Sequence, residues 1–176
     1  MVYLLGILLQ LISTLLLLRI LLQALRADFY NPLSQMVFKL SAPVVEPLSR
    51  LLPPIGRFNI AALVAVLGIR VAFFSFGGNP LPAAFIGASY SLLVLLFDLY
   101  FWGIFILIIA SWVGGHGNPM LAVVQQIVEP YLSVFRRVIP PLGMIDLSPM
   151  AAIFVLIMVR DRGLPMFFNW FQGILL

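Results

Sequence analysis

Long apolar runs that carry almost no charge constrain this 176-residue chain more than any other feature. A membrane-spanning helix needs roughly 20 apolar residues, because only a helix satisfies the backbone N–H and C=O groups of a segment in hydrocarbon. Three runs come near that length, residues 2–25, 60–76 and 90–113, and a fourth, residues 147–159, spans only if it begins near Ile145 and its arginines snorkel. The sequence therefore predicts an all-α membrane protein with four transmembrane helices, the last of which closes at Arg160-Asp161-Arg162.

The composition excludes the common soluble classes. Hydrophobic residues make up 63% of the chain and charged residues 9%, against about 45–50% and 25% in soluble domains. The net charge of +4 does not indicate nucleic-acid binding, because the basic residues flank apolar runs instead of clustering on a polar surface. The first run lacks a basic start and a cleavage signal, so we expect a retained helix.

Two segments between the apolar runs are copies of one another. Residues 31–56 read NPLSQMVFKLSAPVVEPLSRLLPPIG, and residues 118–143 read NPMLAVVQQIVEPYLSVFRRVIPPLG, with a constant offset of 87. Most identical positions restrict the backbone or carry charge. They are Asn31/Asn118, Pro32/Pro119, Val37/Val124, Pro43/Pro130, Arg50/Arg137, Pro53/Pro140, Pro54/Pro141 and Gly56/Gly143. We interpret this pattern as an internal duplication.

The duplication divides the chain into two tandem repeats of helix, amphipathic loop and helix. The first covers residues 1–80 with its loop at 27–57, and the second covers residues 81–163 with its loop at 114–144. Residues 164–176 contain four aromatic and no charged residues. Because aromatic rings favour the headgroup level, we predict that this tail is a C-terminal interfacial segment.

Each loop has the pattern of a short amphipathic helix. Asn31 is a good N-cap before Pro32, whose missing N–H costs nothing at the first helical position. We expect this helix to end before Pro43, with a second short turn before Pro53-Pro54. The apolar face consists of Leu33, Met36, Val37 and Leu40, and in the second copy of Met120, Val123, Val124 and Ile127.

These helices are predicted to lie in the membrane interface, with their arginines near anionic phospholipid headgroups. Re-entrant half-helices are the alternative, but the basic side chains of the loops make deep burial costly. Both long loops are basic, whereas the connection between the second and third runs has no charge. Both long loops of this multi-pass chain are therefore expected to face the cytoplasm, with both termini on the outer side.

Two charged side chains interrupt the apolar runs, Arg70 and Asp98. Their estimated depths, ~10 Å and ~12 Å from the outer ends of antiparallel helices, predict that they pair. Such a pair would lock the helix arrangement; an ion path, a proton relay and snorkelling to the interface are the alternatives. Arg19 is expected to snorkel toward the inner surface.

No pattern for catalysis, metal binding or a cofactor is present. The single histidine, His116, lies among glycines and has no cysteine or second histidine as a co-ligand. We interpret it as a polar loop residue, with a ligand shared in a homodimer as the alternative. Asp146 or Ser148 is expected to cap the last apolar helix. The sequence therefore predicts a protein that is not an enzyme.

The motifs RADFYNP at 26–32, PPIG at 53–56 and PPLGMIDLSP at 140–149 resemble the YggT family of small bacterial membrane proteins. The resemblance covers about residues 15–160. The positions that match the family pattern are Asn31, Pro32, Pro53, Gly56, Asn118, Pro119, Pro140, Gly143, Asp146 and Ser148. The first repeat departs from the second, with Asn59 and Ala61 in place of Asp146 and Ser148.

The resemblance implies a bacterial inner membrane or a plastid membrane. It associates such proteins with osmotic-stress tolerance and ion uptake, with cell division and nucleoid placement, and in plastids with haem attachment to a cytochrome. No single activity unites them, so the resemblance predicts a location more firmly than a function.

Two functions follow as hypotheses. The first is a scaffold or assembly factor whose interfacial loops bind other membrane proteins, in envelope, division or osmotic-stress processes. The second is a small ion channel or ion-transport accessory that uses Arg70 and Asp98. Four helices enclose little room for a pore, so a conducting form would need a homo-oligomer.

Overall fold

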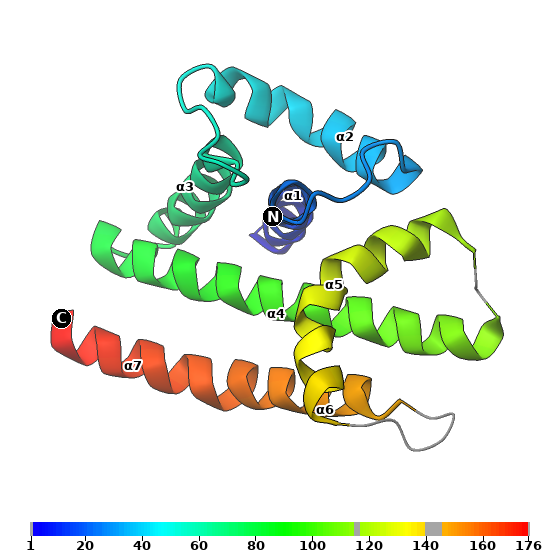
Figure 1. Cartoon of the computed structure of the whole chain (residues 1–176). Coiled ribbons are helices and arrows are strands. Elements are labelled where there is room, and N and C mark those ends of the chain that lie inside the picture. Colours follow the sequence, from blue (N-terminus) through cyan, green and yellow to red (C-terminus); the bar gives the residue numbers. More distant parts are fainter. Residues whose placement is uncertain (1, 115–116, 140–145, 176) are drawn as a thin grey trace. The chain divides into compact units, whose positions relative to one another are not determined.

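The computed structural model describes residues 2–114, 117–139 and 146–175, and these ranges contain helices and no β-strand (Figure 1). The elements are α1 (Val2–Ala24), α2 (Pro32–Ser49), α3 (Ile60–Phe76), α4 (Leu81–Val113), α5 (Pro119–Val138), α6 (Ser148–Met158), the π-helix η1 (Val159–Gly163) and α7 (Leu164–Leu175). Four residues singled out in the sequence lie outside the described ranges: His116, Pro140, Pro141 and Gly143.

Within the described ranges, two helices are long and apolar enough to cross a membrane, α1 with 22 residues from Tyr3 to Ala24 and α4 with 33 residues. Only 22% of the most apolar stretch of each helix is buried by the protein. The rest exposes large apolar side chains that water would solvate poorly. These helices indicate membrane association, and α3 is a shorter apolar helix beside them.

The chain forms two compact units, Met1–Leu95 and Leu96–Leu176, which divide within α4. In the first unit α1, α2 and α3 pack against one another, and Figure 1 shows α2 running crosswise to α1. Fully buried apolar side chains from all three helices form this core: Leu16, Val37, Val45, Ala61, Ala62 and Val66.

In the second unit α5 packs on α6. It also contacts α4 so closely that a Cβ at Gly103 would lie 2.8 Å from Val128 Cγ1.

The loop helices continue through their prolines, so the prediction that the first one ends before Pro43 is wrong. Pro43 and Pro47 lie inside α2, and Pro130 lies inside α5, which changes direction along its length in Figure 1. A helix-internal proline leaves a carbonyl four residues earlier without its donor. All three prolines lie on exposed sides, where water or headgroups can reach that carbonyl, while the opposite side remains packed.

The C-terminal part is also more continuous than predicted. The helix that begins at Ser148 does not close at Arg160 but continues through η1 into α7 (Figure 1), so residues 164–175 are not a separate segment. The π-turn adds one residue, and Leu164 N–H donates to the Val159 carbonyl across it. The charges are tolerated inside the helix because Arg160 forms ion pairs.

Candidate functional site

The two loop helices begin with the same cap. The side-chain oxygens of Asn31 and Asn118 accept hydrogen bonds of 2.9 Å from Leu33 N–H and Met120 N–H. Both caps precede a proline at the first helical position, as the sequence predicts. Each cap satisfies a backbone donor that would otherwise lack a partner at a helix start.

The proline-rich end of the first loop is a tight turn. Pro53 and Pro54 are exposed after α2, and Gly56 has a φ of 61°, which a residue with a Cβ rarely adopts. Ile55 and Phe58 exchange two backbone hydrogen bonds of 3.1 Å across this turn. Asn59 then caps α3 through a bond of 2.8 Å from Ala62 N–H. The motif therefore sets the path from α2 into the next apolar helix.

The α2 helix has three distinct sides. Its buried side consists of Ser34, Val37, Ser41 and Val45. A second, apolar side is exposed and consists of Met36, Leu40 and Val44. A third, polar side is exposed and consists of Gln35, Lys39, Glu46 and Arg50. The sequence grouped Val37 with Met36 and Leu40 and left Ser34 off that face; in the structure Val37 and Ser34 pack inward together.

The α5 helix has a simpler arrangement. Its buried side consists of Val123, Ile127, Val128 and Leu132. Its exposed polar side consists of Gln125, Gln126, Arg136 and Arg137. The apolar Met120, Val134 and Val138 are exposed as well. Both loop helices thus pack on their own unit through one side and expose basic and apolar side chains on the others.

Arg19 anchors α2 to α1; its guanidinium is buried against α2 instead of reaching the inner aqueous surface by snorkelling, as the sequence predicted. Its side chain is only 8% exposed. The Nη1 group donates to the Phe38 carbonyl at 3.2 Å and to Ser41 Oγ at 2.9 Å. The guanidinium also lies 5.1 Å from the centre of the Phe38 ring, a cation–π distance.

Arg70 and Asp98 do not form the predicted pair, because each has partners within its own unit. Arg70 is 3% exposed and donates from Nε to Ser13 Oγ at 3.1 Å, from Nη1 to Ser91 Oγ at 2.8 Å and from Nη2 to Gln10 Oε1 at 3.1 Å. The prediction started the third apolar helix at residue 90, whereas α4 begins at Leu81. Ser91 therefore occupies the level assigned to Asp98, which lies about 10 Å further along the helix.

Asp98 instead forms an ion pair of 2.8 Å with Arg160 Nε, between α4 and the C-terminal helix. Arg160 also contacts Asp161 at 2.9 Å. Asp98 lies 17 residues, or about 26 Å, from the start of α4. The pair therefore lies near the middle of a long apolar helix, where an unpaired charge is costly.

A third polar cluster joins the end of α5 to the start of α6. Arg136 contacts Glu129 at 2.7 Å and Asp146 at 3.1 Å. Asp146 Oδ1 also accepts a 2.9 Å hydrogen bond from Ser148 N–H. The N-cap of α6 is Leu147, so neither Asp146 nor Ser148 is the cap that the sequence predicted; Asp146 satisfies the first backbone donor of α6 from the preceding position. Partial burial would raise the pKa of Asp146, but hydrogen bonds from Ser148 and Arg136 hold it below the ordinary value.

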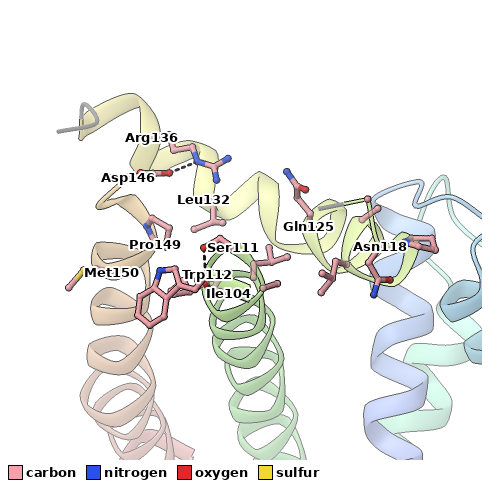
Figure 2. A pocket seen from close by; sticks show the side chains of 17 residues that line it. Ile104, Ser111, Trp112, Asn118, Gln125, Leu132, Arg136, Asp146, Pro149 and Met150 are labelled. Carbon is pink, nitrogen blue, oxygen red and sulfur yellow. Dashed lines mark hydrogen bonds and ion pairs between the residues drawn. The ribbon is translucent and has the colours of Figure 1, made fainter. Parts of the chain in front are cut away.

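A cavity of about 1080 Å³ lies in the second unit beside this cluster. Its lining includes Ile104, Ser111 and Trp112 of α4, Gln125 and Leu132 of α5 and Met150 of α6, all labelled in Figure 2. The Arg136–Asp146 pair lies at one end of it. The Tyr131 hydroxyl also connects α5 to α6, because it donates to the Ala152 carbonyl at 2.9 Å.

Loss of the Asp146 ion pair should make the protein less stable at neutral pH. A carboxyl whose pKa is lowered by folding contributes stability at neutral pH and loses it as pH falls through the folded pKa, below about 4. Asp146→Asn keeps the hydrogen bond to Ser148 N–H, so its thermal midpoint should be below wild type at pH 7, and the difference should shrink as pH falls below about 4 and the carboxylate of the wild type is protonated. Asp146→Ala should cost about 1 kcal/mol more than Asp146→Asn because that hydrogen bond is lost as well. A wild-type advantage over Asp146→Asn that does not shrink with falling pH would contradict the role of the pair.

Comparison with known proteins places these features in a family. The sequence model of the CCB3/YggT family matches residues 1–76 and 86–166. The chain belongs to the CCB3/YggT family. An uncharacterised YggT protein of Escherichia coli K12 is 34% identical over 167 residues, which are 90% of this chain and 86% of that one. An uncharacterised protein of Pseudomonas aeruginosa is 36% identical over 164 residues, 88% of this chain and 83% of that one.

A further CCB3/YggT relative, from Vibrio alginolyticus, is 36% identical over 156 residues, 84% of each chain. No solved structure matches this chain. The resemblance to the YggT family that the loop motifs carry is confirmed. Each matched CCB3/YggT segment contains one loop helix, α2 in the first and α5 in the second.

The polar partners of Arg70 were missed in the sequence. Gln10, Ser13 and Ser91 are isolated polar residues within apolar runs, and Gln10 and Ser13 are three residues apart on one face of α1. Isolated polar side chains in an apolar helix need hydrogen-bond partners. Their spacing could therefore have identified them as the partners of Arg70.

Proposed function

We propose that this chain is a non-enzymatic scaffold or assembly factor of the bacterial inner membrane, which binds partner proteins through α2 and α5. The supporting observation is the three-sided form of α2. Its buried side holds it against α1 and α3, its exposed apolar side suits the acyl region, and its polar side faces water. Because this packing fixes the orientation of α2, its basic side chains stay exposed on one side, where a partner protein can bind them.

The proposed topology has four spans: α1, α3, α4 and the continuous helix from α6 to α7. The basic residues of the segments around α2 and α5 favour the cytoplasmic leaflet for both loop helices, which leaves both termini outside. Arg50 and Arg137 occupy equivalent positions of the two loops and are exposed at or near the ends of α2 and α5. They are the basic side chains that we propose for partner contact.

The hydrogen bonds of Arg70 favour this function over an ion channel. All three guanidinium nitrogens donate to neutral side-chain oxygens of the same unit. A group fixed in this way by α1 and α4 connects helices, whereas an ion path needs charged groups that face water.

Charge reversal at the two equivalent arginines should reduce partner binding. We expect Arg50→Glu with Arg137→Glu to lower the yield of photocrosslinked partner at least about fivefold in cells, because an electrostatic contact becomes repulsive. The crosslinker is placed at Glu46 on the polar side of α2, and membrane insertion is measured in parallel.

The matched control is Arg57→Glu, an exposed arginine between α2 and α3 and outside both loop helices. It should leave the crosslinks unchanged. Unchanged crosslinks in the double variant, with normal insertion, would argue against the scaffold.

A further inference from the structure

A second cavity, of about 610 Å³, lies in the first unit between α1 and the polar side of α2. Its polar lining comes from Arg19 and Gln23 of α1 and from Gln35, Lys39 and Glu46 of α2, with Phe38 beside them. Two cations and one carboxylate leave one net positive charge. That balance suits a ligand group with a single negative charge, such as a phosphodiester.

Arg19 provides a prepared donor at this cavity. Its Nη1 is fixed by the Phe38 carbonyl and Ser41 Oγ, so the guanidinium has a set orientation. The Nε of Arg19 is buried and has no hydrogen-bond partner in the described part of the chain. A buried donor without a partner is costly, and an oxyanion in the adjacent cavity would satisfy it.

The surface below the cavity is apolar. Leu8 and Ile12 precede Arg19 by eleven and seven residues, which places them on the same face of α1. Both side chains are exposed. A ligand that joins a phosphate to long acyl chains could therefore place the phosphate near the cationic side chains of the cavity and its acyl chains along the apolar side chains of α1.

The second repeat has a cavity that is lined by some of the equivalent positions, but the residues at these positions differ. At the offset of 87, Gln23 and Gln35 correspond to Ala110 and Ala122, which line the cavity of the second unit. Arg19 corresponds to Ile106, and Lys39 corresponds to Gln126. Neither cation of the first-unit cavity thus has a cationic counterpart at the equivalent position of the second repeat.

We propose that the first-unit cavity binds the phosphate group of a membrane phospholipid between Arg19 and Lys39, with the acyl chains along Leu8 and Ile12. This lipid site depends on the interfacial position of α2 in the proposed function but not on partner binding by Arg50 or Arg137.

Native mass spectrometry of the purified full chain, released from detergent with added dioleoyl phosphatidylglycerol, tests the site. The variant is Gln35→Ala with Lys39→Gln, which installs the residues that the second repeat carries at these positions. Its lipid affinity should fall at least about tenfold, because a charged contact and an amide donor are lost. The control, Arg57→Gln, removes an exposed charge that does not line the cavity and should bind as wild type does.

Two further ligands separate the sources of the phosphate. Dioleoyl glycerol lacks the phosphate, so any binding that it shows should be equal in wild type and variant. Inorganic phosphate should not displace the lipid at equal concentration. Equal lipid binding by wild type and variant, or an equal loss in Arg57→Gln, would overturn the proposal. Displacement by inorganic phosphate would replace the lipid with a soluble anion. Failure of crosslinking with intact lipid binding would reject only the partner-binding role.

Discussion

Removal of the oxygen acceptors around Arg70 should destabilise this protein more than removal of Arg70 itself. Ser13→Ala with Gln10→Leu would leave a buried guanidinium with one remaining acceptor, Ser91. Hydrogen bonds to charged groups contribute about 1.5–3 kcal/mol each, so the loss of two is expected to cost roughly 3–6 kcal/mol. Arg70→Met removes the charge together with its desolvation cost and should lose much less.

The combination of these variants provides the control. Adding Arg70→Met to the acceptor double variant should recover most of the lost stability, because the remaining site is apolar. Thermal unfolding in detergent micelles measures each variant. If Arg70→Met alone is as damaging as the loss of the acceptors, the guanidinium has a role beyond connecting the helices.

Breaking the Asp98–Arg160 pair should be the second large effect. Asp98→Asn leaves Arg160 with only its neighbour Asp161, near the middle of apolar helices. An unpaired charge at that depth costs about 2.5–3.5 kcal/mol, and part of this should appear as a lower unfolding midpoint. The charge swap Asp98→Arg with Arg160→Asp should restore stability above either single variant.

Ion flux separates this structural role from transport. Ion flux into liposomes should be the same for purified wild-type protein and for Asp98→Asn, because the carboxylate is held in an ion pair. Flux through wild-type protein that disappears in Asp98→Asn, without restoration in the charge swap, would support the channel hypothesis instead.

The sequence predicted helix bounds correctly where they depend only on nearby residues, such as an apolar run or an N-cap. The bounds of α3 match the apolar run at 60–76, and α1 ends one residue before the predicted end. Asn31 and Asn118 form the expected caps because an N-cap depends only on the next three residues. Membership in the CCB3/YggT family followed from the same short motifs.

Predictions failed where packing outweighs local preference. Pro43 does not stop α2, because the buried side of that helix packs against α1 and α3 around it. Arg160 does not end the last helix, because Asp98 compensates its charge from a segment 62 residues earlier. The buried Ser34 and Ser41 were invisible in the amphipathic pattern, which assigns serine to the wet face.

Cysteine accessibility of α2 is the most direct measurement of its position at the inner membrane surface. The chain contains no cysteine, so Met36→Cys and Arg50→Cys each introduce a single thiol. With a membrane-impermeant maleimide, Arg50→Cys should react in inside-out vesicles but not in intact spheroplasts. Met36→Cys, on the exposed apolar side, should react in neither until detergent is added. Reaction of Met36→Cys as fast as Arg50→Cys from either side would contradict an α2 helix that lies in the lipid surface.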